Sequence, residues 1–118
     1  MLKYILDENK TPVAVEDVLE WARWYETVDR VVCRTLFPEM KACISTVFLG
    51  IDHAFVGGRP ILFESMLFVG TMAGEDMRRY CTWADAEAGH KEMVDAYIAS
   101  KSLHGIRLQL TATEESVS

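Results

Sequence analysis

Three polar residues near the middle of the chain, Asp52, His53 and Glu64, are the side chains best suited to do chemistry. Asp52 and His53 directly follow one apolar run, and Glu64 lies within the next. An aspartate can orient an imidazole for proton transfer, and a second carboxylate would add a metal ligand. Neighbouring residues of a strand point to opposite faces, however, so Asp52 and His53 converge only if the strand ends between them. We therefore favour an exposed turn pair over a metal or acid–base site.

Glu64 shares its strand face with large apolar side chains, where an unpaired carboxylate is costly. Arg34, on the neighbouring predicted strand, is the expected partner in a cross-strand ion pair. This structural pair is favoured over a catalytic carboxylate. If the protein instead holds a small ligand, the candidate binding residues are Arg34, Asp52, His53 and Glu64.

His90 and two tryptophans fall on the apolar faces of predicted helices. We expect His90 to be a core histidine bonded to a backbone carbonyl. Trp21 and Trp24 are expected to pack as core residues, and they are also the candidates for contact with another protein. A base-stacking role would need basic residues nearby, which only Arg23 and Arg30 supply.

The sequence lacks the patterns typical of catalytic or cofactor sites. Its histidines and cysteines do not have zinc-ligand spacing, and Gly57-Gly58 is not followed by the Lys-Ser/Thr pair of a phosphate-binding loop. Ser45, Ser65 and Cys81 have no neighbouring nucleophile motif. We therefore expect a protein that is not an enzyme and that needs no metal and no cofactor.

The elements that position these residues follow from the spacing of apolar side chains. Runs rich in β-branched and aromatic residues predict strands over residues 4–6, 13–15, 31–37, 43–51, 61–69 and 77–81. Helical spacing predicts amphipathic helices over 16–29 and from the Thr82 cap to about Ser100. Strands 43–51 and 61–69 carry large apolar groups on both faces, so we expect them to be central strands covered by a helix. The fold class is thus α+β, with an antiparallel sheet of about four strands packed against two helices.

We expect residues 1–102 to form a single domain and residues 103–118 a partly disordered C-terminal extension. A turn is predicted over residues 70–76, before the last strand of the domain. Within the extension, residues 106–110 are a candidate edge strand, and the polar tail 111–118 is expected to be disordered.

Composition limits the partners. The chain has 118 residues, half of them apolar, and a net charge of −6, which disfavours direct nucleic-acid binding. It has no apolar run long enough for a membrane span and no signal-peptide pattern. Cys33, Cys43 and Cys81 are an odd number, which favours reduced thiols in the cytoplasm. A disulfide between Cys33 and Cys43 across a hairpin is an open alternative.

Four segments are distinctive in combination: WARWYE at 21–26, STVFLGIDH at 45–53, LFESMLF at 62–68 and YCTWADAEAGH at 80–90. With them the chain resembles a family of small phage- and prophage-encoded proteins, over roughly residues 4–98. The resemblance implies a phage setting and a site of action in the cytoplasm of the host bacterial cell. It supplies no catalytic residues.

Three functions are consistent with these observations. The favoured one is a small acidic interaction protein without catalysis, which binds a host protein or complex and could inhibit a bacterial defence complex. The second is a small-ligand or nucleotide binder with a pocket between sheet and helices. The third is a metal-dependent hydrolase built on Asp52, His53 and Glu64. A homodimer is compatible with each of them.

Overall fold

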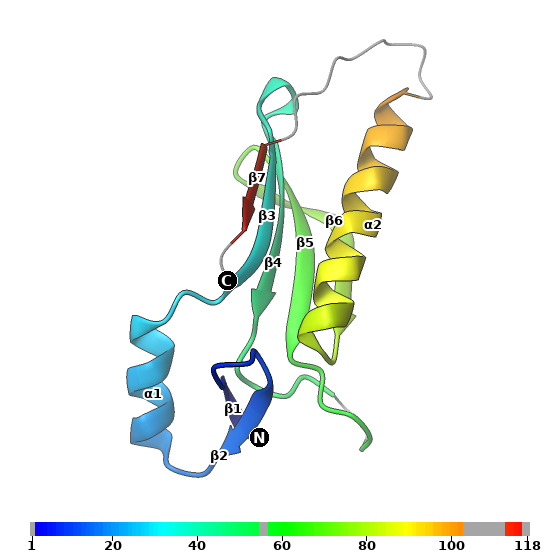
Figure 1. The fold of residues 1–118 in the computed structure, drawn as a ribbon. Coiled ribbons are helices and arrows are strands. Elements are labelled where there is room, and N and C mark those ends of the chain that lie inside the picture. The colour runs from blue at the N-terminus through cyan, green and yellow to red at the C-terminus, as the bar shows by residue number, and fades with distance from the viewer. Residues whose placement is uncertain (1, 55–56, 103–112, 117–118) are drawn as a thin grey trace.

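The computed structural model describes residues 2–54, 57–102 and 113–116. In these residues it has a two-stranded and a five-stranded antiparallel sheet and two α-helices (Figure 1). The fold class is α+β, as the sequence predicts.

The N-terminal unit consists of a hairpin and a short helix at one end of the molecule. Strands β1 (Lys3–Leu6) and β2 (Pro12–Val15) pair antiparallel, and helix α1 spans Val18–Thr27. The Asp7 carboxylate closes the hairpin turn by accepting hydrogen bonds from the amides of Asn9 and Thr11. Asp17 caps α1 by accepting from the amides of Leu19 and Glu20, which places the helix start two residues after the predicted one.

The main sheet has the strand order β6-β5-β4-β3-β7. Its members are β3 (Val31–Phe37), β4 (Ala42–Phe48), β5 (Phe63–Val69), β6 (Met72–Tyr80) and β7 (Thr113–Ser116). A one-turn 3-10 helix, Pro38–Met40, joins β3 to β4. The predicted strands 31–37, 43–51 and 61–69 are therefore present, although β4 ends at Phe48. The chain turns at Gly50, where φ is +75° and a Cβ would lie 3.0 Å from the Tyr25 ring.

Two predicted segments near the edges of this sheet need correction. The turn predicted over 70–76 is wrong, because Gly70 and Thr71 alone form the turn and β6 begins at Met72. The small and acidic residues that suggested a turn lie on an edge strand, at a register shift opposite Met66 and Phe68, where apolar alternation is not required. The tail was expected to be disordered, yet Thr113–Ser116 pairs with β3 as β7. The candidate strand at 106–110 lies outside the described residues.

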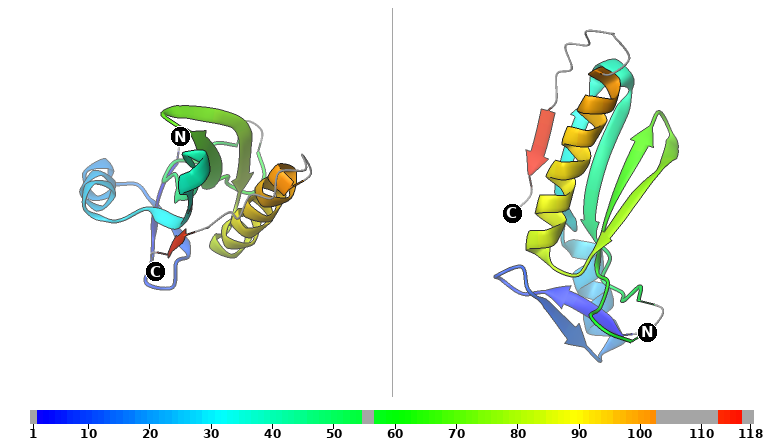
Figure 2. Two further views of the ribbon diagram at one scale, coloured as in Figure 1. Left: turned by 90° about the horizontal axis from the view of Figure 1, so that it is seen from above. Right: turned by 90° about the vertical axis from the view of Figure 1, so that its right-hand side faces the viewer.

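Helix α2 (Trp83–Ser102) lies along one face of the five-stranded sheet (Figure 2). The hydroxyl of Thr82 accepts a hydrogen bond from the Asp85 amide, so the predicted cap is confirmed. The core between helix and sheet contains large side chains that are almost completely buried, among them Phe37, Ile44, Phe48, Phe63 and Met93. Burying each contributes about 1.5–3 kcal/mol.

The contact between α2 and β6 is unusually close. Gly89 on the helix faces Tyr80 at the end of β6, and a Cβ at Gly89 would overlap the tyrosine ring. The glycine therefore allows the helix backbone to lie directly on the ring. The Tyr80 hydroxyl is buried and has no hydrogen-bond partner among the described residues.

Cys33 and Cys43 are not opposite each other across the β3–β4 hairpin. Cys33 is paired in register with Thr46, and Cys43 with Leu36. Together with Cys81 they remain thiols. The alternative of a disulfide between Cys33 and Cys43 does not apply in this structure.

Candidate functional site

Asp52 and His53 close the loop that follows β4. One oxygen of the Asp52 carboxylate accepts from the amides of Ala54 and Ile61, at 2.8 and 2.9 Å. His53 Nδ1 lies 2.7 Å from the carbonyl oxygen of Ile51, and the His53 amide donates to the Ile61 carbonyl. The bond from the Ala54 amide, then that from Ile61, lowers the pKa of Asp52 below the ordinary 3.8, and the charge of His53 adds to the effect. The pair therefore holds the two sides of the loop together.

Glu64 pairs with Arg79 and not with Arg34. Arg79 Nε lies 3.0 Å from the Glu64 carboxylate, and the two residues are directly opposite in the β5–β6 register. The predicted Arg34 pair is wrong because β4 lies between β3 and β5, so Arg34 is opposite Ser45. The sequence indicates that Glu64 needs a cationic partner, but it does not indicate the strand order, which decides that the partner is Arg79.

The combined metal or acid–base site is not assembled in the part of the chain that the structure describes. No group of three or more histidine, cysteine, aspartate or glutamate side chains there could hold a metal ion. Asp52 is bonded to loop amides, and Glu64 is bonded to an arginine on the neighbouring strand. Neither carboxylate is arranged as a ligand.

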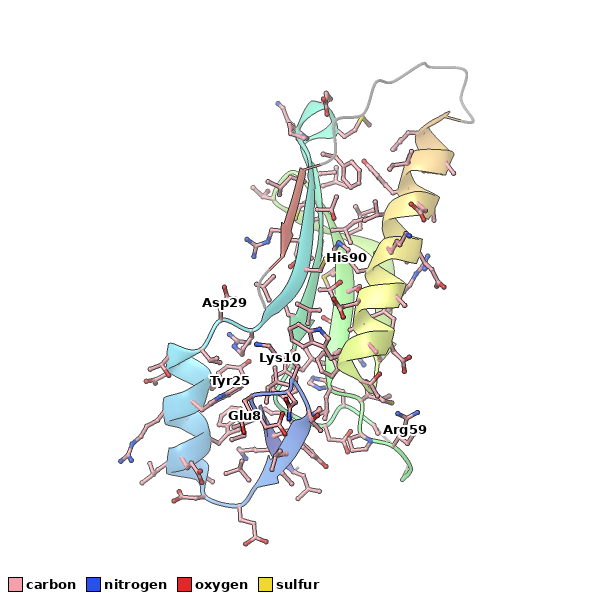
Figure 3. All side chains as sticks on the ribbon, viewed as in Figure 1. Glu8, Lys10, Tyr25, Asp29, Arg59 and His90 are labelled. Atoms are coloured by element: carbon pink, nitrogen blue, oxygen red, sulfur yellow. The ribbon has the colours of Figure 1, made fainter. Side chains whose placement is uncertain are left out.

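His90 forms a buried polar network that the sequence analysis missed. Its Nε2 lies 2.8 Å from the Thr35 hydroxyl and its Nδ1 lies 2.7 Å from the Thr46 hydroxyl, which in turn contacts the Ser65 hydroxyl. All four residues are at most 2% exposed, and His90 points from α2 toward the sheet (Figure 3). The predicted carbonyl partner is thus replaced by hydroxyls, which can donate or accept. The sequence signal for this network is the presence of two threonines and a serine at inward-facing positions of the strands.

This network joins one helix to three strands and is closed to solvent. A serine, a threonine and an imidazole that are hydrogen-bonded one to the next resemble a proton-transfer chain. No substrate reaches these residues, however, because they are almost completely buried. The network is structural: its hydrogen bonds fix the position of α2 along the sheet.

Trp21 and Trp24, the tryptophans proposed for partner contact, anchor α1. Trp21 Nε1 donates to the carbonyls of Tyr4 and Gly50 at 3.2 Å each, and its ring stacks on Tyr25. Trp24 meets Phe48 edge-on, with ring centroids 5.7 Å apart. Both are half-buried. These contacts attach the helix to the hairpin and to the end of the main sheet.

The exposed apolar side chains of the N-terminal unit are different ones. They are Leu2, Val13, Val18 and Leu19, which are 58, 43, 55 and 66% exposed. Val18 and Leu19 are adjacent at the start of α1, whereas Leu2 and Val13 lie at separate places on the hairpin. We call Val18 and Leu19 the N-terminal apolar surface. Glu16, Asp17 and Glu20, all exposed, lie at the same end of α1. An apolar surface beside acidic groups is characteristic of an interaction site.

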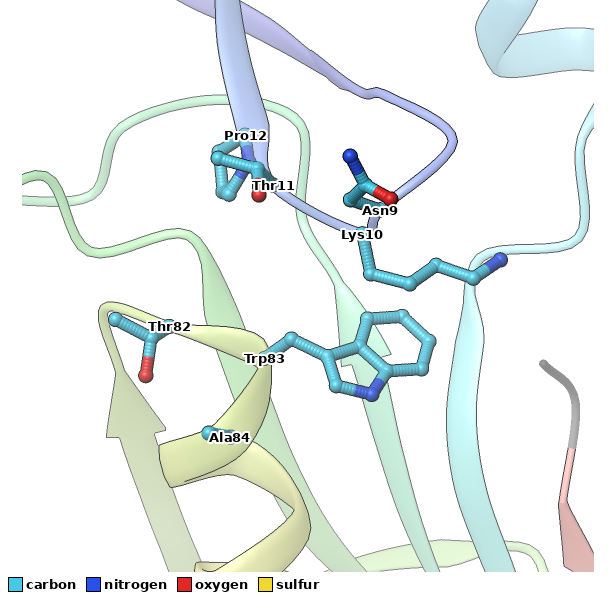
Figure 4. Close-up of a pocket in the computed structure, with 7 residues that line it drawn as sticks. All are labelled: Asn9, Lys10, Thr11, Pro12, Thr82, Trp83 and Ala84. Carbon is cyan, nitrogen blue, oxygen red and sulfur yellow. The ribbon is translucent and has the colours of Figure 1, made fainter.

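A pocket of about 310 Å³ lies between the β1–β2 turn and the start of α2 (Figure 4). The lining residues are Asn9, Lys10, Thr11, Pro12, Thr82, Trp83 and Ala84. The Lys10 ammonium lies 5.3 Å from the centre of the Trp83 ring. The ligand candidates Arg34, Asp52, His53 and Glu64 do not line this pocket.

Comparison with other proteins adds no assignment: no family model, curated protein or solved structure matches the chain. Of the helices in the described residues, none is long and apolar enough to cross a membrane.

Proposed function

We propose that this chain is a non-catalytic interaction protein that binds another protein through the N-terminal apolar surface. The observation that supports this best is the exposure of two adjacent large apolar side chains, Val18 and Leu19, at the start of α1. Adjacent exposed apolar groups bordered by polar residues are a feature of interaction sites. Leu19, the more exposed of the two, would be the central contact.

The charge around this surface favours a basic partner. Glu16, Asp17 and Glu20 add local negative charge to a chain whose net charge is −6. Such a surface complements basic residues, which proteins that handle nucleic acid carry in abundance. In the phage setting that the resemblance implies, the partner is a bacterial defence complex. The chain would block the site at which this complex binds nucleic acid.

The anchoring of α1 supports the proposal, because a rigid surface loses little conformational entropy on binding. The contacts of Trp21 with two carbonyls and of Trp24 with Phe48 hold the helix against the rest of the molecule. The tryptophans thus position the binding surface instead of forming it.

The test is binding of the immobilised full chain to purified candidate defence complexes, with Leu19→Lys as the variant. Loss of this contact is expected to weaken binding about 30-fold, as for an interface hot spot. Met66→Lys, on a different face, is the matched control and is expected to bind like the wild type. Normal binding by a folded Leu19→Lys protein would overturn the proposal.

A small-ligand or nucleotide binder is the second candidate, because of the pocket beside Lys10 and Trp83. A positive charge over an indole ring suits a planar anionic ligand. This function predicts that nucleotides raise the thermal midpoint of the wild type and do not raise that of Lys10→Gln.

A further inference from the structure

The five-stranded sheet has one covered and one open face. Helix α2 covers the face that carries Phe37, Ile44 and Phe63. No described element packs on the opposite face, and α1, although on that side, lies beyond the end of the sheet (Figure 2). The residues of this open face alternate in sequence with the buried ones.

Strand registers place large apolar side chains together on the open face. Cys43 is opposite Leu36 on one side and Phe68 on the other. In the adjacent row Met66 is opposite Met77 on one side and Ser45 on the other, and Ser45 is opposite Arg34. Val47 lies in the row beyond, beside Glu64. All of these apolar residues are at least partly exposed, and Met77 is 44% exposed. The open face of an antiparallel sheet is normally polar, so this number of apolar side chains is unusual.

The charges of this face are largely compensated within it. On this face Glu64 is bonded to Arg79, and Arg34 of β3 is opposite Glu115 of β7 in the strand register. The chain as a whole carries 18 acidic and 12 basic residues. The charges of the open face are therefore balanced, although the molecule as a whole is acidic.

We propose that a second copy of this chain covers the open face, giving a symmetric dimer with its two sheets packed face to face. Two acidic molecules repel each other on most approaches, but here they meet without opposing acidic surfaces. A basic partner, in contrast, has more to gain at the acidic N-terminal surface. Two-fold symmetry then places like faces together, as in most homodimers.

The area is sufficient for a specific contact. Five strands spaced by about 4.8 Å and seven residues rising by about 3.3 Å each give a face of roughly 550 Å². Two copies would bury about 1,100 Å², just above the roughly 1,000 Å² that a specific interface requires. Methionines suit such packing, because their flexible side chains adapt to an opposing surface.

The experiment is a molar-mass measurement by light scattering on the full chain as it elutes from a sizing column. The wild type is expected at twice the 13.4 kDa of one chain. Met66→Lys places a charge at the centre of the face and is expected to halve the mass. Ser45→Arg, at the neighbouring β4 position, is a second variant in case the first does not fold. Leu19→Lys is the matched control and is expected to remain dimeric.

Circular dichroism and thermal melting establish that each variant is folded. A wild type that is monomeric at about 100 μM, where a dimer with a Kd of about 1 μM would be almost fully formed, overturns the proposal. So does a folded Met66→Lys or Ser45→Arg protein that keeps the dimer mass. Dissociation by Leu19→Lys alone would place the interface on the N-terminal surface and would also contradict it. Binding of a defence complex is measured separately, so either proposal can fail without the other.

Discussion

His90 is bonded through both ring nitrogens, and its partners come from two strands. A neutral imidazole donates from one nitrogen and accepts at the other, so it matches two hydroxyls fully. The residue thus joins α2 to the sheet through buried hydrogen bonds.

Replacing His90 with leucine is expected to lower the free energy of unfolding by about 2–4 kcal/mol, because the buried Thr35 hydroxyl loses its imidazole partner and the Thr46 hydroxyl keeps only Ser65. Adding Thr35→Val is expected to restore part of this loss, since the orphaned hydroxyl is removed. Denaturant unfolding of the single and double variants gives the coupling energy. Lys91→Leu, on the exposed side of α2, is the control and should change stability by less than about 0.5 kcal/mol. Strictly additive effects of His90→Leu and Thr35→Val would contradict the network.

Asp52 makes loop stability depend on pH. The amides of Ala54 and Ile61 lower the pKa of its carboxyl in the folded state, so the ionised group stabilises the fold above the ordinary value of 3.8. This contribution is lost as the pH falls through the lowered folded-state pKa. Asp52→Asn is therefore expected to be less stable than the wild type at neutral pH, and the difference should shrink below pH 3.8. Unfolding curves from pH 7 to pH 2 measure it, and a difference that is the same at every pH would exclude this role.

At the scale of the element, α2 is held by three kinds of contact. Thr82 caps its start, His90 bonds its middle to the sheet, and Gly89 lies directly on the Tyr80 ring. The glycine is unfavourable for an isolated helix by about 1 kcal/mol relative to alanine. Its presence is explained by the packing and not by helix propensity.

Gly89→Ala is accordingly expected to destabilise the protein by about 1–3 kcal/mol, because the new methyl group overlaps the Tyr80 ring. In a Tyr80→Leu background the same change should cost much less. Tyr80→Phe serves as the control: since the buried hydroxyl has no partner among the described residues, its removal is expected to be neutral or slightly stabilising. Denaturant unfolding measures the wild type and the four variants. A Gly89→Ala protein more stable than the wild type would show that the helix shifts freely.

At the scale of the whole molecule, the two proposed interfaces differ in their charge. The N-terminal apolar surface adjoins the exposed acidic residues Glu16, Asp17 and Glu20. On the open face of the sheet, in contrast, the charge of Glu64 is compensated by its ion pair with Arg79. Binding at the first surface should therefore weaken with salt, and association through the second should persist, because salt screens exposed charges and spares apolar contacts. This contrast separates the two proposed interfaces.

Much of the local structure was predictable. Residues 31–37 form a strand as predicted, and Thr82 caps α2, because apolar alternation and capping chemistry act between near neighbours in sequence. Edge segments were not predictable in the same way. Residues 72–76 look like a turn in composition, yet pairing with β5 and a register shift make them part of β6.

The sequence by itself determined the α+β class, the two helices and the need of Glu64 for a cationic partner. Only the tertiary structure decided that the partner is Arg79, that His90 meets two threonines, and that Val18 and Leu19 are exposed while Trp21 and Trp24 anchor α1. The physical reason is that strand order and helix placement depend on contacts between distant segments, and local periodicity carries no record of which strand lies beside which.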